Sequence, residues 1–206
     1  MNRARLDDLL GDETLVADVL ARYGEPGRHY HTVEHVDAVL DAIDLWYPTA
    51  PTWIRLAAVY HDVVYDPHST SNEADSAVHA YRQLCERRST AELGWIHEAI
   101  VMTAHHRLDV LDYRLHPLLV GDLISMACPR EAYRANTARI RAEYAHASDE
   151  QWAAGRQRFI ASFLVHRILP FEARFDAPEA VIRENMIDEL ERLDPRFAAL
   201  ATPLND

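Results

Sequence analysis

The sequence predicts an all-α protein, folded as an irregular antiparallel bundle of helices with no substantial sheet. Glycine occurs only six times in 206 residues, whereas Ala, Leu, Glu and Arg, which favour helices, are frequent. Apolar residues recur at helical spacing in several segments, and prolines or capping residues separate these segments. The length suits one well-buried core, so we expect a single domain over residues 1–206.

The first helical element is expected over about residues 3–23, because the loop Gly24-Glu25-Pro26-Gly27 follows it. A second helix is expected from about Tyr30 to Trp46. Its core stripe consists of Val36, Val39, Leu40 and Ile43. Since His31 and His35 are four residues apart, they would share one face of that helix.

A third helix should begin near Thr52, after Pro48 and Pro51, and lead into the dipeptide His61-Asp62. Residues 70–73 (TSNE) predict a capping box that opens a helix to about Arg88. Residues 89–92 (STAE) predict a second capping box, for a helix that ends near His106.

The last third of the chain continues in the same manner. Pro117 should open a helix that runs through Asp122, and Pro129 should end it. Further helices are expected from about Arg130, Ser148 and Pro178.

Composition excludes some classes of function. The formal net charge is −12, so the average field repels polyanions and disfavours binding of long nucleic acids. Cys85 and Cys128 form no Cys-x-x-Cys pattern, which suggests reduced thiols. No stretch is long and apolar enough for a signal peptide or a membrane span, and we therefore expect a cytoplasmic protein that does not bind membranes.

The dipeptide His61-Asp62 carries the strongest functional signal. It lies in an apolar helical stretch, where adjacent ionisable side chains are costly to bury without partners. His35 upstream and Asp122 downstream would complete a set of two imidazoles and two carboxylates, which is suited to a divalent metal ion. Taken singly, His61 could instead be a hydrogen-bonded core histidine, and Asp62 a carboxylate paired with arginine.

Together these residues resemble the HD superfamily of metal-dependent phosphohydrolases, in particular its small bacterial branch of predicted phosphohydrolases. The similarity extends over most of the chain. It is carried by RHYHTVEHV at 28–36, HDVVYD at 61–66, NEADSA at 72–77, DL at 122–123, IRAEY at 140–144, GR at 155–156 and IRENM at 182–186. The chain departs from the usual pattern at Thr32, at Val120 and at Met126-Ala127, none of which is an expected ligand.

The resemblance implies a single HD-type helical domain, with the C-terminal helices packed on it. It implies that His35, His61, Asp62 and Asp122 ligate one divalent ion per chain. Mixed nitrogen and oxygen ligands favour a transition metal only weakly, so Mn, Fe, Ni, Co, Zn and Mg all remain open. Such an ion would make hydroxide available near neutral pH.

Six further residues are candidates for the surroundings of the ion. His31, His106 and Glu73 are candidates for catalysis beside Asp62, and Arg28, Tyr30 and Asp66 for substrate binding. Five of them also have a structural explanation. His31 could lie on the surface, His106 could close a helix end, Glu73 could belong to its capping box, and Arg28 and Asp66 could be loop residues.

The expected activity is hydrolysis of a small phosphate ester, most plausibly a nucleotide. One alternative is a metal-containing module that senses a nucleotide with little turnover. Another is a two-iron oxygenase, which would need more ligands than these four. His106 could serve a second metal ion in that case. The sequence gives neither the substrate nor the oligomeric state.

Overall fold

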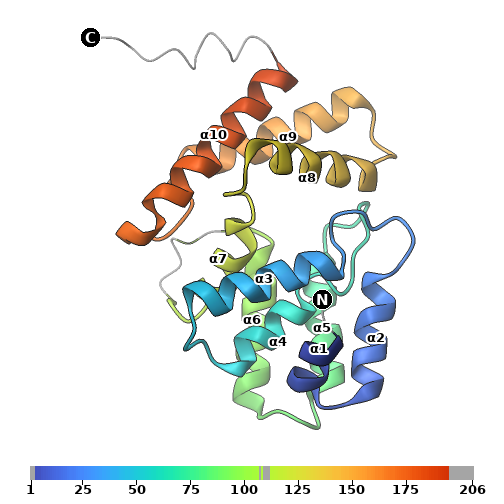
Figure 1. The fold of residues 1–206 in the computed structure, drawn as a ribbon. Helices are drawn as coiled ribbons and strands as arrows, with labels where there is room; N and C mark the ends of the chain where they lie inside the picture. The colour runs from blue at the N-terminus through green and yellow to red at the C-terminus, as the bar shows by residue number, and fades with distance from the viewer. Residues whose placement is uncertain (1–2, 107, 109–111, 195–206) are drawn as a thin grey trace. The chain divides into compact units, whose positions relative to one another are not determined.

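The protein is entirely helical over the residues that the computed structural model describes, which are 3–106, 108 and 112–194. These ranges contain α-helices and one short 3₁₀ turn but no strand, which confirms the predicted fold class (Figure 1). The α-helices are α1 (Arg3–Leu10), α2 (Glu13–Tyr23), α3 (Val33–Trp46), α4 (Thr52–Tyr60), α5 (Asn72–Leu84), α6 (Thr90–Thr103), α7 (His116–Ile124), α8 (Arg130–Glu143), α9 (Asp149–Leu164) and α10 (Asp176–Leu193).

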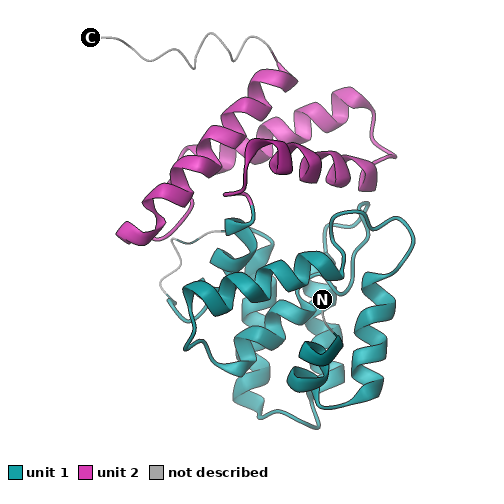
Figure 2. Cartoon of the chain, in the orientation of Figure 1, with its two compact units in different colours: residues 1–125 teal, residues 126–206 magenta. Residues whose placement is uncertain are grey.

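The chain divides into two compact units, residues 1–125 and 126–206 (Figure 2). In the first unit, α4 packs against α3, α5, α6 and α7, and α3 packs against α7. In the second unit, α10 packs against α8 and α9. Compactness and independent folding are different properties, so a single domain over 1–206 stays a prediction.

The segment predicted as one element over 3–23 contains two helices. Gly11 follows α1 with a φ of 63°, a left-handed conformation that glycine adopts without steric cost. Asp12 then caps α2, because its carboxylate accepts hydrogen bonds from the backbone N–H groups of Thr14 and Leu15. A glycine followed by an N-capping aspartate is a sequence signal for this helix boundary, and it could have been used to predict two helices.

The helix predicted from Tyr30 begins at Val33 instead, with Thr32 as its N-cap. Residues 30 to 32 form a bend, in which the Thr32 N–H donates to the carbonyl oxygen of Tyr30 at 2.8 Å. His31 therefore lies before the helix and His35 lies within its first turn. The prediction that these two histidines share a helix face is wrong.

The helix α4 is buried along most of its length in unit 1. Its residues are fully or largely buried at Trp53, Ile54 and every position from Leu56 to Tyr60. His61 follows directly as its C-cap. A helix held in place by buried apolar side chains therefore positions the His61-Asp62 dipeptide in the interior of the unit.

Of the two predicted capping boxes, one is confirmed. Ser89 accepts from the Glu92 N–H, and Glu92 accepts from the Ser89 N–H. The box at 70–73 is wrong, because α5 begins after Ser71, which makes no side-chain capping bond. There the amide of Asn72 pairs with the backbone of Asp66 in both directions, at 2.9 Å each.

Unit 2 contains a buried polar network. Arg156 donates to both carboxylate oxygens of Glu189 at 2.8 Å, and Tyr133 donates to the same carboxylate at 2.7 Å. Asn185 donates to two backbone carbonyls, and Arg183 pairs with Glu179 at 2.7 Å. Through these contacts Arg156, Arg183 and Asn185 brace the helices of unit 2.

Gly121 allows α3 and α7 to approach closely. A Cβ atom at this position would lie 3.1 Å from both the Val39 carbonyl oxygen and Ile43 Cγ1. We expect Gly121→Ala to destabilise the protein, because overpacking costs about 1–3 kcal/mol and the backbone oxygen cannot move aside. Chemical denaturation against Gly94→Ala measures this. A Cβ at Gly94 in α6 meets nothing within 4 Å, so that control should gain up to about 1 kcal/mol from helix propensity; equal effects would contradict the close approach.

Candidate metal centre

Three separate segments of unit 1 supply the four predicted ligands. His35 comes from the first turn of α3, and Asp122 comes from α7. His61 caps α4, and Asp62 follows it in the turn that leaves that helix. Because α3 packs on both α4 and α7, these side chains converge in the interior of the unit.

His35, His61 and Asp62 form a group that can hold a metal ion. One ligand atom from each residue lies within 4.8 Å of the others. His35 Nε2 is 3.2 Å from His61 Nε2 and 3.5 Å from Asp62 Oδ2, and His61 Nε2 is 2.9 Å from Asp62 Oδ2. Both histidines are buried, at 6% and 1% exposure, so the donors are already desolvated.

Asp122, the fourth predicted ligand, lies next to this group. Its Oδ1 lies 3.2 Å from His35 Nε2 and 3.9 Å from His61 Nε2. Ligand atoms bound about 2.1 Å from one ion lie about 3.0–3.4 Å apart at octahedral or tetrahedral angles. The distances among His35, His61 and Asp62, from 2.9 to 3.5 Å, are close to that range, so these three donors fit one divalent ion. Asp122 is not a member of this group, although its Oδ1 lies near His35 Nε2.

The orientation of His61 also suits ligation. Its Nδ1 lies 2.8 Å from the carbonyl oxygen of Ala58, which can only accept a hydrogen bond. Nδ1 is therefore the protonated nitrogen of the neutral ring, and the lone pair of Nε2 is directed at the carboxylate of Asp62. A lone pair facing an anion is repulsive unless a cation or a proton lies between them.

The charges of the centre are strongly coupled. Burial lowers the pKa of His35, but Tyr30 and the carboxylates of Asp122 and Asp62 outweigh it, so that pKa lies well above its ordinary value of 6.5. Burial likewise lowers the pKa of His61, and Asp62 reverses the shift. Burial raises the pKa values of Asp62 and Asp122, but the surrounding histidines bring both well below 3.8.

These shifts predict different pH dependences for the stability of the metal-free and the metal-loaded protein. Histidines with a raised pKa stabilise the folded state below the unfolded value of 6.5, and this contribution is lost as pH rises through the folded pKa. The aspartates with a lowered pKa stabilise it above 3.8 and lose this on acidification. We therefore expect the metal-free protein to be most stable between these two values.

The metal-loaded protein should not lose stability in this way above pH 6.5, because a metal ion binds only the deprotonated imidazoles. Urea denaturation at several pH values, with a chelator or with excess Co²⁺, measures both curves. Parallel curves with and without the ion would contradict the prediction.

His106 touches the centre through Asp122. Its Nε2 lies 2.7 Å from Asp122 Oδ2, the oxygen that does not face His35. His106 has a φ of 48°, the left-handed region, and among the described residues it is the only one other than glycine with positive φ. Its side chain is 26% exposed, against 12% for Asp122. A backbone held in this conformation aims the imidazole at the carboxylate.

His31 lies beside the centre rather than in it. Its ring stacks on Tyr65 at 4.4 Å between centroids and meets the ring of His35 edge-on at 5.8 Å. His31 is half-buried, which leaves it accessible for contact with a substrate. Tyr65 was not among the predicted site residues, although it lies three residues after Asp62.

The structure gives Arg28 and Tyr30 roles other than the predicted contacts with substrate. The Arg28 guanidinium is occupied by backbone carbonyls near Asp62, and its side chain is 2% exposed. The Tyr30 ring lies 5.0 Å from that of His35, and its hydroxyl is 3.3 Å from Ser125 Oγ. Ser125, which the sequence analysis missed, donates to the Asp122 carbonyl at 2.9 Å.

Asp66 and Glu73 lie in and after the turn that follows the His-Asp pair. Asp66 is exposed and its carboxylate accepts from the His68 N–H at 2.9 Å, which agrees with the turn role. Glu73 is half-buried at the start of α5, one turn before Ser76. Ser76 bonds the backbone of Val64, so this end of α5 is held against the turn. The predicted functions of both acids stay predictions.

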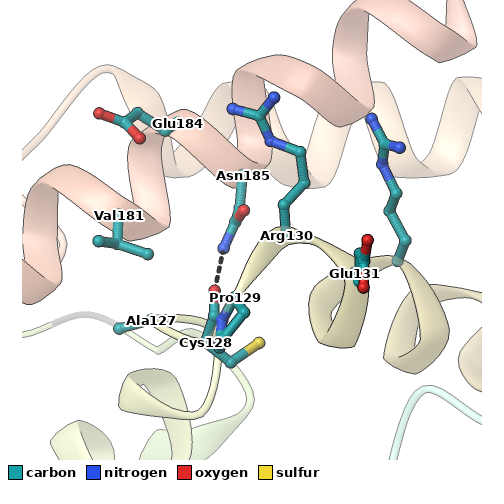
Figure 3. A pocket seen from close by; sticks show the side chains of 9 residues that line it. Ala127, Cys128, Pro129, Arg130, Glu131, Val181, Glu184 and Asn185 are labelled. Atoms are coloured by element: carbon teal, nitrogen blue, oxygen red, sulfur yellow. Dashed lines mark hydrogen bonds between the residues drawn. The ribbon is translucent and has the colours of Figure 1, made fainter.

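A separate cavity of about 700 Å³ lies in unit 2, between the start of α8 and α10 (Figure 3). Arg130, Arg134, Glu131 and Glu184 contribute both signs of charge to its lining. The Asn185 amide donates to the Cys128 carbonyl in its wall at 2.9 Å. None of the predicted site residues lines this cavity.

Among the described residues, no helix has the length and apolar character needed to span a membrane. Comparisons with family models, with curated proteins and with solved structures found no match to this chain.

Proposed function

We propose that this protein is a metal-dependent phosphohydrolase that acts on a small phosphate ester, most plausibly a nucleotide, through metal-activated water. The observation that supports this is the group of His35, His61 and Asp62, whose donor atoms lie 2.9 to 3.5 Å apart, with Asp122 Oδ1 at 3.2 Å from His35 Nε2. When bound, a divalent ion would polarise a phosphoryl oxygen and lower the pKa of water in its shell.

The side chains around the ion would transfer protons and contact the phosphate. The carboxylates of Asp62 and Asp122 are the anionic groups of the centre and would accept the proton of the attacking water. His106 shares Asp122 and is partly exposed, so it can pass a proton between that carboxylate and the leaving group. His31 lies next to the centre and would contact the phosphate.

The size of the substrate follows from charge. A net charge of −12 opposes the approach of a long chain of phosphates, whose binding depends on many cationic contacts. One phosphate group needs only the ion and a few local donors. The proposed substrates are therefore small phosphorylated molecules rather than polynucleotides.

The test is metal analysis followed by a phosphate-release screen with nucleotides and simple phosphate esters. In this screen His106→Asn is compared with His35→Ala, since asparagine tolerates the left-handed backbone at 106. We expect His106→Asn to keep its metal and lose turnover, and His35→Ala to lose both. A metal-loaded protein that leaves every substrate unchanged would overturn the hydrolase proposal, and a nucleotide recovered intact from it would favour the sensing alternative.

A further inference from the structure

Arg28 reaches from the loop after α2 to the backbone of the metal-binding turn. Its Nη1 donates to the carbonyl oxygens of Asp62 at 2.7 Å and His31 at 3.1 Å. Its Nη2 donates to the carbonyl oxygen of Val63 at 3.0 Å and to a carboxylate oxygen of Glu25 at 3.4 Å. All four terminal N–H groups thus have acceptors, and three of these are backbone oxygens.

The guanidinium is fixed in place by its surroundings. It lies over the ring of Tyr23 at 5.1 Å and over that of Tyr65 at 5.4 Å. The Tyr23 hydroxyl in turn donates to the carbonyl oxygen of Val59, in the last turn of α4. With its side chain only 2% exposed, Arg28 has neither a free terminal donor nor the access to meet a phosphate.

Two of the three carbonyls that Arg28 holds, those of Asp62 and Val63, belong to residues that follow α4, where no helical N–H is available to them. Two consecutive peptide groups, those of Asp62 and Val63, are held by one rigid fork. The Asp62 side chain leaves the same backbone and faces both histidines. Displacement of this turn would move the Asp62 carboxylate relative to His35 and His61.

We infer that Arg28 is a positioning residue of the metal centre, which sets the location of Asp62 and thereby the affinity for a divalent ion. This inference rests on the proposed metal centre. Groups that orient metal ligands from behind commonly change affinity by about 10- to 100-fold when removed. We expect Arg28→Ala to weaken Co²⁺ binding by about that factor. Arg28→Lys should lie in between, because an ammonium group cannot hold both peptide groups in a fixed plane.

The matched control is Arg5→Ala. Arg5 also belongs to unit 1 and binds several acceptors, the carboxylates of Asp37, Asp41 and Asp44, but no metal ligand or its backbone. Co²⁺ affinity and the visible spectrum of bound Co²⁺ are measured at a temperature where circular dichroism shows each variant folded. The expected pattern is weaker binding and an altered spectrum in both Arg28 variants, with wild-type values for Arg5→Ala.

Two results would overturn the inference. One is wild-type Co²⁺ affinity in a folded Arg28→Ala protein, or in Arg28→Lys where the alanine variant does not fold. The other is an equal loss in Arg5→Ala, which would trace the effect to general destabilisation. Failure of the metal centre itself is distinguished by His61→Ala, because retention of Co²⁺ in that variant would refute the site whatever the Arg28 variants do.

Discussion

His61→Ala is expected to abolish most divalent metal binding, lowering the content from about one ion per chain. The substitution removes the donor that lies 3.2 Å from His35 and 2.9 Å from Asp62, at the middle of the group. It also leaves buried carboxylates with less compensation. Metal content after gel filtration, measured by elemental analysis, gives the result directly.

Stability measurements provide an independent readout. An ion present at 100 times its dissociation constant stabilises the folded protein by about 2.7 kcal/mol, or about 5–10 °C in melting temperature for a chain of this size. His61→Ala should lose this metal-dependent increase. The control is His79→Ala, which breaks a histidine–carboxylate pair of 2.7 Å with Asp18 elsewhere in unit 1. If both variants retained the same metal-dependent increase, the assignment of the centre would be wrong.

Glu189→Ala is expected to cost about 3–5 kcal/mol, because it leaves the guanidinium of Arg156 buried without a counter-ion. The Glu189 side chain is 1% exposed and that of Arg156 is 11% exposed. Tyr133 would lose its acceptor as well. Urea denaturation gives the total loss, and hydrogen exchange over residues 126–194 locates it.

Asp188→Asn is the matched control, one residue away on the same helix. Its partners Arg130, Arg134 and Arg192 have side chains that are 42–54% exposed. Such ion pairs contribute about 1 kcal/mol or less each, and asparagine retains an acceptor for them. A loss in Glu189→Ala no larger than that in the control would show that the buried network contributes little.

The helical fold could be predicted from the sequence because its determinants are local. Ser89 and Glu92 form the capping box that their spacing predicts. The failures also have local causes. The spacing of Thr70 and Glu73 fits the pattern of a capping box, but the helix begins one residue later, and Asn72 bonds the backbone of Asp66 across the preceding turn. Such a bond depends on the path of the loop between the two helices, and this path cannot be predicted from helical periodicity.

The donor group of the site was predictable because residue type and chain order carry its chemistry. Asp122 is far from Asp62 in sequence, yet both were identified as carboxylates suited to one ion, and the structure brings both to His35. The role of Arg28 was not predictable. The sequence shows only an arginine in a loop. Its acceptors include backbone carbonyls 34 and 35 residues away. Every residue type has a backbone carbonyl, so such acceptors cannot be recognised from residue type.

Gly121 and Asp122 would have to be transferred together if this site were designed into another protein. The glycine sets the spacing of α3 and α7, and the next residue, Asp122, presents its carboxylate across that spacing to His35. Grafting the aspartate alone onto another helical scaffold would leave it too far from the imidazole by roughly the thickness of a methyl group. A transplanted site must therefore include the glycine as well as the aspartate that follows it.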